Sequence, residues 1–163
     1  MESRIDITKV DPKAVQAMTA LETYIHRSSL EKPLLELVKM RASQINGCAY
    51  CLDMHSKDAR VAGETEQRLY ELNAWRETPF YSERERAALA WTESLTLVSE
   101  THVPDEVFEE VKKHFSEAEI VALTLAIVAI NGWNRIAISL RAVPGTYQPA
   151  ALSQHASAAP KTA

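Results

Sequence analysis

The sequence predicts an all-α domain of about six to seven helices. Apolar residues recur three and four positions apart through most of the chain, which is the spacing of one helix face. Two segments, residues 82–85 and 116–119, have the form of a helix capping box. The four glycines and seven prolines lie mostly where helical patterns begin or end, and alternation typical of β-strands is hard to find.

The first helices follow from local signals. Asp11 and Pro12 occupy positions favoured as N-cap and first-turn residue, so a helix is expected to begin there. A second helix is expected over residues 32–45, with an apolar face formed by Leu34, Val38, Ala42 and Ile45. Asn46-Gly47 then breaks the chain, and Asn46 is expected to serve as N-cap of a third helix from Gly47 to about residue 62.

The later elements are delimited in the same way. Gly63 ends the third helix, Thr65 opens a short one, and each capping box opens a longer one. Val143-Pro144-Gly145 stops the last helix. The remaining helices are expected over residues 65–75, 82–98, 104–115 and 116–142.

The length of 163 residues indicates one domain, expected over residues 1–147, followed by a tail, 148–163, that is rich in Ala, Ser and Pro and expected to be disordered. Residues 120–130 are apolar on almost all sides, so that helix needs cover on most of its surface. Subunit packing would supply this cover, so we expect a homo-oligomer, a trimer or a hexamer. The alternative is an ordinary central core helix.

Composition excludes several function classes. Apolar residues make up 46% of the chain and charged residues 25%, the net charge is −4, and Lys and Arg are scattered, so neither a nucleic-acid nor a membrane surface is indicated. The N-terminus lacks the apolar stretch of a signal peptide, and the apolar run 120–130 is too short to span a bilayer. A soluble cytoplasmic protein is expected, and there a Cys-x-x-Cys is more often catalytic or metal-binding than structural.

The most informative motif holds the only two cysteines of the chain, Cys48 and Cys51, with His55 four positions after the second. On a helix these three residues share one face. Thiols on adjacent turns are close enough to form a disulfide. An imidazole and a helix N-terminus both favour the thiolate, the nucleophilic form of cysteine. The motif therefore predicts a dithiol redox centre.

The spacing suggests a division of labour but leaves alternatives open. Cys51, beside His55, would attack an electrophile such as a peroxide, and Cys48, nearer the exposed end, would resolve the sulfenic acid into a disulfide. Zinc is one rival, because Cys48, Cys51 and His55 could supply three ligands and another histidine or a carboxylate the fourth. The other rival is a pair of structural thiols in a helical core.

A longer stretch of sequence resembles a known family. Residues 36–55 resemble the signature Glu-x11-Cys-x2-Cys-x3-His of the alkyl hydroperoxidase D-like branch of the carboxymuconolactone decarboxylase family, here carried by Glu36, Cys48, Cys51 and His55. Residues 90–93 and 131–136 also look like this branch, so the resemblance covers roughly residues 30–145. The combined pattern is far more specific than Cys-x-x-Cys alone.

The resemblance implies that Cys51 is the peroxidatic cysteine, Cys48 the resolving one, and His55 with Glu36 a proton relay. The best-studied members have a second histidine just before the second cysteine, where this chain has Tyr50. A tyrosine is no base at neutral pH, so Tyr50 is expected to give hydrogen-bonding support only. The family also suggests a lipoyl- or thioredoxin-like dithiol reductant. No metal, flavin or other cofactor is implied.

Without the resemblance, some of these residues would be interpreted differently. On a helical wheel Glu36 falls with Lys39 and Ser43, opposite the apolar stripe, and would be a solvated carboxylate. Only its offset from Cys51 distinguishes His55 from an ordinary histidine. Other notable residues are expected to pack or to contact a neighbouring subunit: Trp91, Trp133, Asn134 and Arg135.

The sequence thus favours a thiol-dependent peroxidase acting on hydrogen peroxide or an organic hydroperoxide. The alternative from another class is a non-enzymatic redox-sensing or zinc-holding protein that uses Cys48, Cys51 and His55. A decarboxylase-type lyase is disfavoured, because that branch of the family usually lacks the cysteine pair.

Overall fold

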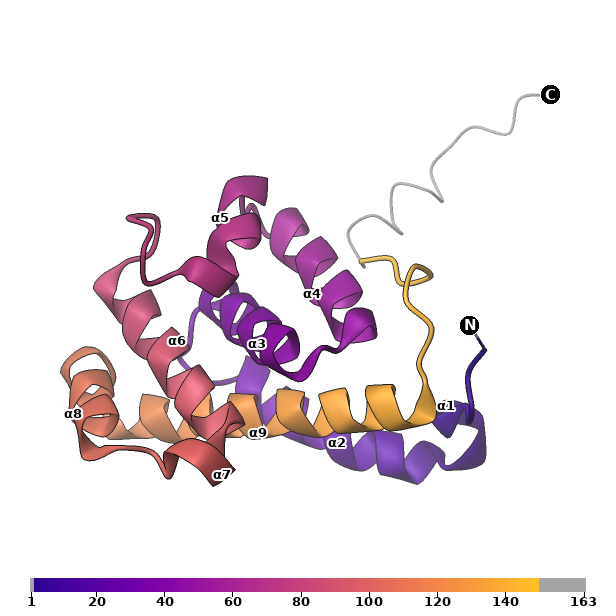
Figure 1. Ribbon diagram of the computed structural model, residues 1–163. Helices are drawn as coiled ribbons and strands as arrows, with labels where there is room; N and C mark the ends of the chain where they lie inside the picture. The colour runs from indigo at the N-terminus through magenta and orange to yellow at the C-terminus, as the bar shows by residue number, and fades with distance from the viewer. Residues whose placement is uncertain (1, 150–163) are drawn as a thin grey trace.

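The computed structural model describes residues 2–149, and every regular element in this range is a helix (Figure 1). The all-α class is confirmed. The expected six to seven helices are too few, because two four-residue helices, α1 and α7, were not predicted. The elements are α1 (Ile7–Val10), α2 (Pro12–His26), α3 (Lys32–Asn46), α4 (Ala49–Val61), α5 (Glu66–Glu71), the 3₁₀ turn η1 (Leu72–Ala74), α6 (Glu83–Thr96), α7 (Val98–Thr101), α8 (Asp105–His114) and α9 (Glu117–Leu140).

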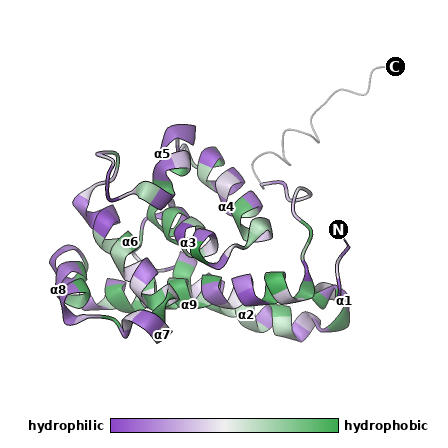
Figure 2. Cartoon of the chain, viewed as in Figure 1, coloured by the Kyte–Doolittle hydropathy of each residue, from purple (hydrophilic) through white to green (hydrophobic). Residues whose placement is uncertain are grey.

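Helix α9 runs along the length of the molecule, and α2, α3, α4, α6 and α8 pack against it (Figure 1). It begins at the predicted capping box, in which Ser116 and Glu119 satisfy each other's backbone N–H groups. The apolar run 120–130 is only part of this 24-residue helix, which contains an 18-residue window with a mean hydropathy of 1.5 and, by length and composition only, is long and apolar enough to cross a membrane. Its contacts with these five helices are those of a core helix, and much of its ribbon is coloured as hydrophobic in Figure 2.

Helix α3 lies between α4, α6 and α9 and is buried on several sides. Leu37, Val38 and Ala42 are fully buried in it, and so is Ser43 on the side that the helical wheel assigned to solvent. Because neighbours cover both faces, side chains on opposite sides of α3 all leave water. This central position brings residues of α3 to the site described below.

The turn from α3 to α4 differs from the prediction. Gly47 adopts a left-handed conformation with φ of 69°, and the backbone N–H groups of Gly47 and Cys48 close a Schellman motif on Gln44 and Ser43. Asn46 is therefore the last residue of α3 and not the N-cap of α4. Its side-chain amide donates to Asn131 and Asn134 of α9, at 2.9 and 2.8 Å. Cys48 takes the N-cap position instead.

Several other boundaries agree with local chemistry. Asp11 caps α2 by accepting from Lys13 and Ala14, and the Ser82 capping box opens α6. The predicted helix 82–98 is interrupted at Leu97, whose ψ of 35° separates α6 from α7. Of the predicted disordered tail, residues 150–163 lie outside the described residues.

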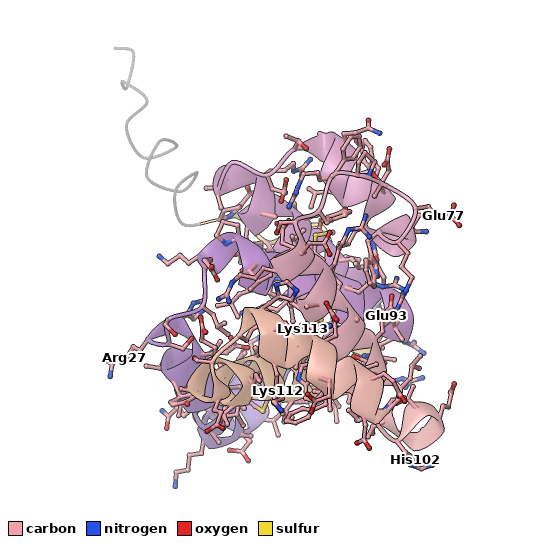
Figure 3. All side chains as sticks on the ribbon, turned by 90° about the vertical axis from the view of Figure 1, so that its left-hand side faces the viewer. Arg27, Glu77, Glu93, His102, Lys112 and Lys113 are labelled. Atoms are coloured by element: carbon pink, nitrogen blue, oxygen red, sulfur yellow. The ribbon has the colours of Figure 1, made fainter. Side chains whose placement is uncertain are left out.

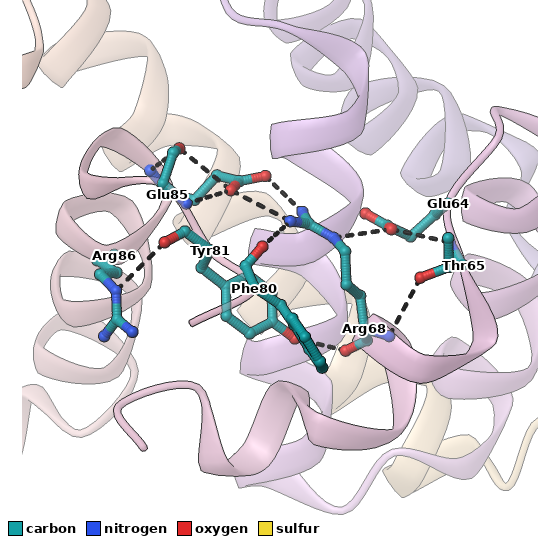
Figure 4. A network of polar contacts seen from close by, with 8 residues as sticks. Glu64, Thr65, Arg68, Phe80, Tyr81, Glu85 and Arg86 are labelled. Carbon is teal, nitrogen blue, oxygen red and sulfur yellow. Dashed lines mark hydrogen bonds and ion pairs between the residues drawn. The ribbon is translucent and has the colours of Figure 1, made fainter. Parts of the chain in front are cut away.

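Polar contacts far from the cysteines fix the outer helices. Arg68 of α5 bridges Glu64, at 2.8 Å, and Glu85 of α6, at 2.5 Å, while its guanidinium lies over the Tyr81 ring (Figure 4). On α8, Lys112 and Lys113 are exposed on the face turned to the viewer in Figure 3.

Candidate active site

The two thiols lie together at the start of α4. Cys48 is the N-cap and Cys51 the third residue of the helix, so both are near the unpaired N–H groups of its first turn. Both cysteines are free, and their Sγ atoms are 2.7 Å apart. Each is only 1% exposed. The expectation that Cys48 lies nearer the exposed end is therefore wrong, because α9 packs over this turn.

The hydrogen bond between the sulfurs shifts the pKa values of the two thiols in opposite directions. The Cys51 thiol donates to the Cys48 thiolate, which lowers the pKa of Cys48 to about 6, and the charge of His55 adds to this effect. The same bond, together with burial and the Cys48 charge, raises the pKa of Cys51. The pair therefore holds one negative charge near neutral pH, and its proton lies between two sulfurs at hydrogen-bond distance.

His55 is held by Glu36, whose carboxylate oxygen Oε2 is 2.8 Å from His55 Nδ1. Both side chains are largely buried, at 7% and 14% exposure. Burial alone would raise the pKa of the Glu36 carboxyl, but the hydrogen bond and charge of His55 outweigh it, and the pKa falls below its ordinary value. Glu36 is thus ionised and fixes the orientation of the imidazole.

The interpretation of Glu36 as a solvated surface carboxylate is wrong. The wheel placed it with Lys39 and Ser43, and all three side chains lie inside the fold. Lys39 is compensated by Glu22 of α2, with Nζ and Oε2 2.9 Å apart. The periodicity of one helix cannot reveal this, because it does not show that α4 and α2 cover the second face of α3.

A buried polar network supports the thiols from α9. The Asn134 side chain is completely buried, donates to Ser43 Oγ at 3.0 Å and accepts from Asn46 Nδ2 at 2.8 Å. The same amide favours the thiolate form of both cysteines. Sequence analysis assigned Asn134 to packing and missed this contact. The available signal was its spacing from Ile130, which puts an amide on an apolar helix face.

A cavity of about 600 Å³ opens beside the site. Cys51 lines it and Cys48 does not, so small molecules in the cavity meet Cys51. The wall on the side of α9 is mainly apolar and includes Trp133, Ile136 and Leu140. The wall on the side of α2, α3 and α4 carries Glu22, His26, Glu36, Lys39, His55 and Asp58.

The ligand geometry does not favour zinc on the thiols. Within residues 2–149, the group of side chains whose ligand atoms converge to within 4.8 Å of one another is Glu36, His55 and Asp58. Neither Cys48 nor Cys51 belongs to it, so the set of two thiols and His55 is not assembled as a metal site.

The remaining predicted residues have simpler surroundings. Tyr50 is half-buried and lines the cavity, and its hydroxyl makes no hydrogen bond within the described part of the chain. Trp91 packs in the core and donates to Thr124 Oγ1 at 3.1 Å, as a packing residue would. Arg135 donates back to Asn131 on its own helix. Trp133 lies in the cavity wall and not only in packing contacts.

The chain is similar to known proteins over most of its length. Residues 12–94 match the model of the carboxymuconolactone decarboxylase family, and this match includes both cysteines, His55 and Glu36. The uncharacterised protein YdfG of Bacillus subtilis is 46% identical over 140 residues, which are 86% of this chain and 95% of that protein.

Solved structures give the same assignment. A protein of unknown function from Agrobacterium tumefaciens, proposed to be the antioxidant defence protein AhpD, superposes with a TM-score of 0.86 at 46% identity, covering 90% of this chain and all of the other. An uncharacterised peroxidase-related protein from Silicibacter superposes at 0.74 with 25% identity, over 83% and 72% of the two chains. The chain therefore belongs to the carboxymuconolactone decarboxylase family, in its alkyl hydroperoxidase D-like branch.

Proposed function

We propose that this chain is a thiol-dependent peroxidase that reduces hydrogen peroxide or an organic hydroperoxide through a Cys48–Cys51 dithiol/disulfide cycle. One observation carries the proposal: two free thiols, 2.7 Å apart, lie at the start of a helix beside a cavity. Of the two thiols, Cys51 lines this cavity, and so does the hydrogen-bonded pair Glu36–His55. The peroxidase-related and antioxidant descriptions of the structural relatives support the same reaction class. The apolar wall of the cavity favours an organic hydroperoxide.

The cycle starts from the charge that the thiol pair holds. The proton of Cys51 moves to the Cys48 thiolate across their hydrogen bond, and the Cys51 thiolate attacks the terminal peroxide oxygen. The O–O bond breaks, Cys51 becomes a sulfenic acid, and the leaving alkoxide takes a proton to become the alcohol. His55, oriented by Glu36, is placed on the cavity wall to supply and recover that proton.

The second half of the cycle restores the thiols. The Cys48 thiol attacks the sulfenic sulfur of Cys51, a disulfide forms, and water leaves. An external dithiol of the lipoyl or thioredoxin type then reduces this disulfide and is itself oxidised. Because both sulfurs are buried, the reductant has to reach the disulfide through the cavity, at Cys51. No metal or flavin takes part in these steps.

A redox sensor would use the same disulfide without repeated turnover, and it is the second candidate that the geometry allows. Catalytic regeneration separates the two: an enzyme consumes many equivalents of peroxide per chain when a dithiol is supplied, and a sensor consumes one. Lactone decarboxylation, the activity in the family's name, has no use for the paired thiols.

The deciding experiment is stopped-flow peroxide reduction by wild type, Cys48→Ser and Cys51→Ser. We expect Cys51→Ser to abolish turnover, and Cys48→Ser to form a sulfenic acid at Cys51 that a dimedone-type reagent traps. Fast peroxide consumption by Cys51→Ser, with the sulfenic acid on Cys48, would reverse the assignment of the two thiols. No consumption by wild type with any dithiol would refute the peroxidase itself.

A further inference from the structure

Asp58 lies beside the Glu36–His55 pair without having been singled out by the sequence motif. It follows His55 by three positions on α4, so the two side chains share a face. The carboxylate oxygens of Asp58 and Glu36 and a ring nitrogen of His55 lie within 4.8 Å of one another. All three residues line the cavity next to Cys51. The imidazole therefore has two carboxylates around it.

Tyr147, from the segment that follows α9, holds this second carboxylate. Its hydroxyl lies 2.8 Å from Asp58 Oδ1 and 3.0 Å from Oδ2, to which it donates. The segment is fixed on α4 by two further contacts: Lys57 Nζ donates to the Tyr147 carbonyl at 3.0 Å, and the Gly145 N–H donates to Asp53 at 3.0 Å. The C-terminal end of the domain thereby reaches the wall of the site.

The groups around Asp58 act on its pKa in both directions. Burial raises the pKa of the Asp58 carboxyl, and the negative charge of Glu36 adds to this, whereas the Tyr147 hydroxyl favours the carboxylate. The positive charges of His55 and Lys39 also favour the carboxylate, and the pKa of Asp58 stays raised above its ordinary value. The titratable groups that face Asp58 are Glu36 and Lys39 from α3, His55 from α4 and Tyr147 from the C-terminal segment, and Glu22 and His26 from α2 line the same cavity.

We propose that Asp58, held by Tyr147, is a positioning residue that acts on the thiols through His55. Two carboxylates lie within 4.8 Å of the imidazole, so their negative charges stabilise positive charge on the ring while it holds a proton taken from a thiol, and this favours the thiolate at the start of α4. His55 already favours the Cys48 thiolate. Asp58 thus strengthens the nucleophile without contacting the reacting atoms, and Tyr147 keeps its charge in place. The role of Asp58 in peroxide reduction rests on the proposed function, but its effect on thiol reactivity can be measured without peroxide.

The test measures alkylation of the reduced full-length chain by iodoacetamide between pH 5 and pH 9, with wild type, Asp58→Asn, Tyr147→Phe and Asp53→Asn. Asp58→Asn is expected to raise the apparent thiol pKa, about 6 in wild type, by about one unit, which slows alkylation roughly tenfold at pH 5. Tyr147→Phe is expected to shift the profile in the same direction by less, because the carboxylate remains. Asp53→Asn is the matched control, because Asp53 also binds the segment after α9 but does not face His55.

The outcomes are separable. A profile of Asp58→Asn that superposes on wild type, or that moves to lower pH, overturns the inference. An equal shift in Asp53→Asn also overturns it, since closure of the segment would then be the cause. Thermal unfolding at pH 7 excludes a merely structural role if Asp58→Asn is at least as stable as wild type. If wild type reduces no peroxide but Asp58→Asn still shifts the profile, the proposed function fails and this inference stands.

Discussion

Low thiol pKa and contact with the cavity belong to different cysteines of the pair. The structure gives Cys48 the lower pKa, about 6, because the Cys51 thiol donates to it. It gives Cys51 the contact with the cavity. The same hydrogen bond reconciles these two properties, since a proton transferred between the sulfurs moves the nucleophile to the accessible side. A low thiol pKa by itself would therefore be a poor guide to which cysteine meets the substrate.

The Glu36–His55 pair gives a prediction at the residue scale. His55→Ala is expected to slow oxidation of Cys51 by about 100-fold or more, the usual range for loss of a general acid–base group. Glu36→Gln should act in the same direction but less, because it removes the partner that orients the imidazole. Stopped-flow oxidation rates measure both effects. Wild-type behaviour of Glu36→Gln would limit the relay to His55.

Glu36 also gives a stability signature that is independent of activity. Its pKa in the folded state lies below the ordinary value of 4.5, so its ionised form stabilises the fold above that pH. This stabilisation is lost as the pH falls below 4.5 and through the folded-state pKa. The melting temperature of Glu36→Gln should therefore depend less on pH in this acidic range than that of wild type.

At the scale of elements, the turn between α3 and α4 sets the geometry of the thiols. Gly47, with φ of 69°, ends α3, and Cys48 directly after it is the N-cap of α4. The Cys-x-x-Cys motif therefore begins at the N-terminus of α4. A Cβ at Gly47 would meet nothing within 4 Å. The constraint at this position is thus the backbone conformation and not the space around it.

A pair of substitutions tests this turn. Gly47→Ala is expected to destabilise the protein by about 1–2 kcal/mol, the cost of a left-handed conformation for an ordinary residue. Gly47→Asn should cost less, since asparagine tolerates this conformation better than alanine. Chemical denaturation with both variants measures the difference. Equal losses would point to side-chain crowding and contradict the backbone argument.

At the scale of the whole molecule, α9 is both core and surface. Ile127 and Ile130 are buried in it, while Val121 and Val128, seven residues apart on another face, are each 54% exposed. An apolar face of this kind on a central helix is an expected subunit contact. We therefore retain the proposal of a homo-oligomer built on α9.

The assembly is tested by light scattering at micromolar concentration. We expect a mass well above the 18.2 kDa of one chain for wild type, and a shift toward the monomer for Val128→Asp, because a charge would be buried in the contact. Val98→Asp on α7 is a matched control, since Val98 is 50% exposed outside α9. A wild type of 18.2 kDa at every concentration would refute the proposal.

The sequence by itself determined what depends on neighbours along the chain. The helices were predictable because caps such as Ser82 and Ser116 act within one turn. The pairing of Cys48 and Cys51 follows from a spacing of three residues at the start of a helix. Even here one local signal misled, since Gly47 was read as the start of α4, although a left-handed glycine ends the helix before it.

Only the tertiary structure decided the surroundings of those thiols. Glu36 meets His55 across 19 positions, Asn134 meets Ser43 across 91, and Tyr147 meets Asp58 across 89. Which cysteine opens to the cavity depends on how α9 and the N-terminal residues close around α4. Periodicity identifies the apolar face of one helix, but it cannot tell that a second, polar face will also be covered. Burial of that face turns a solvated carboxylate into a partner of the active-site histidine.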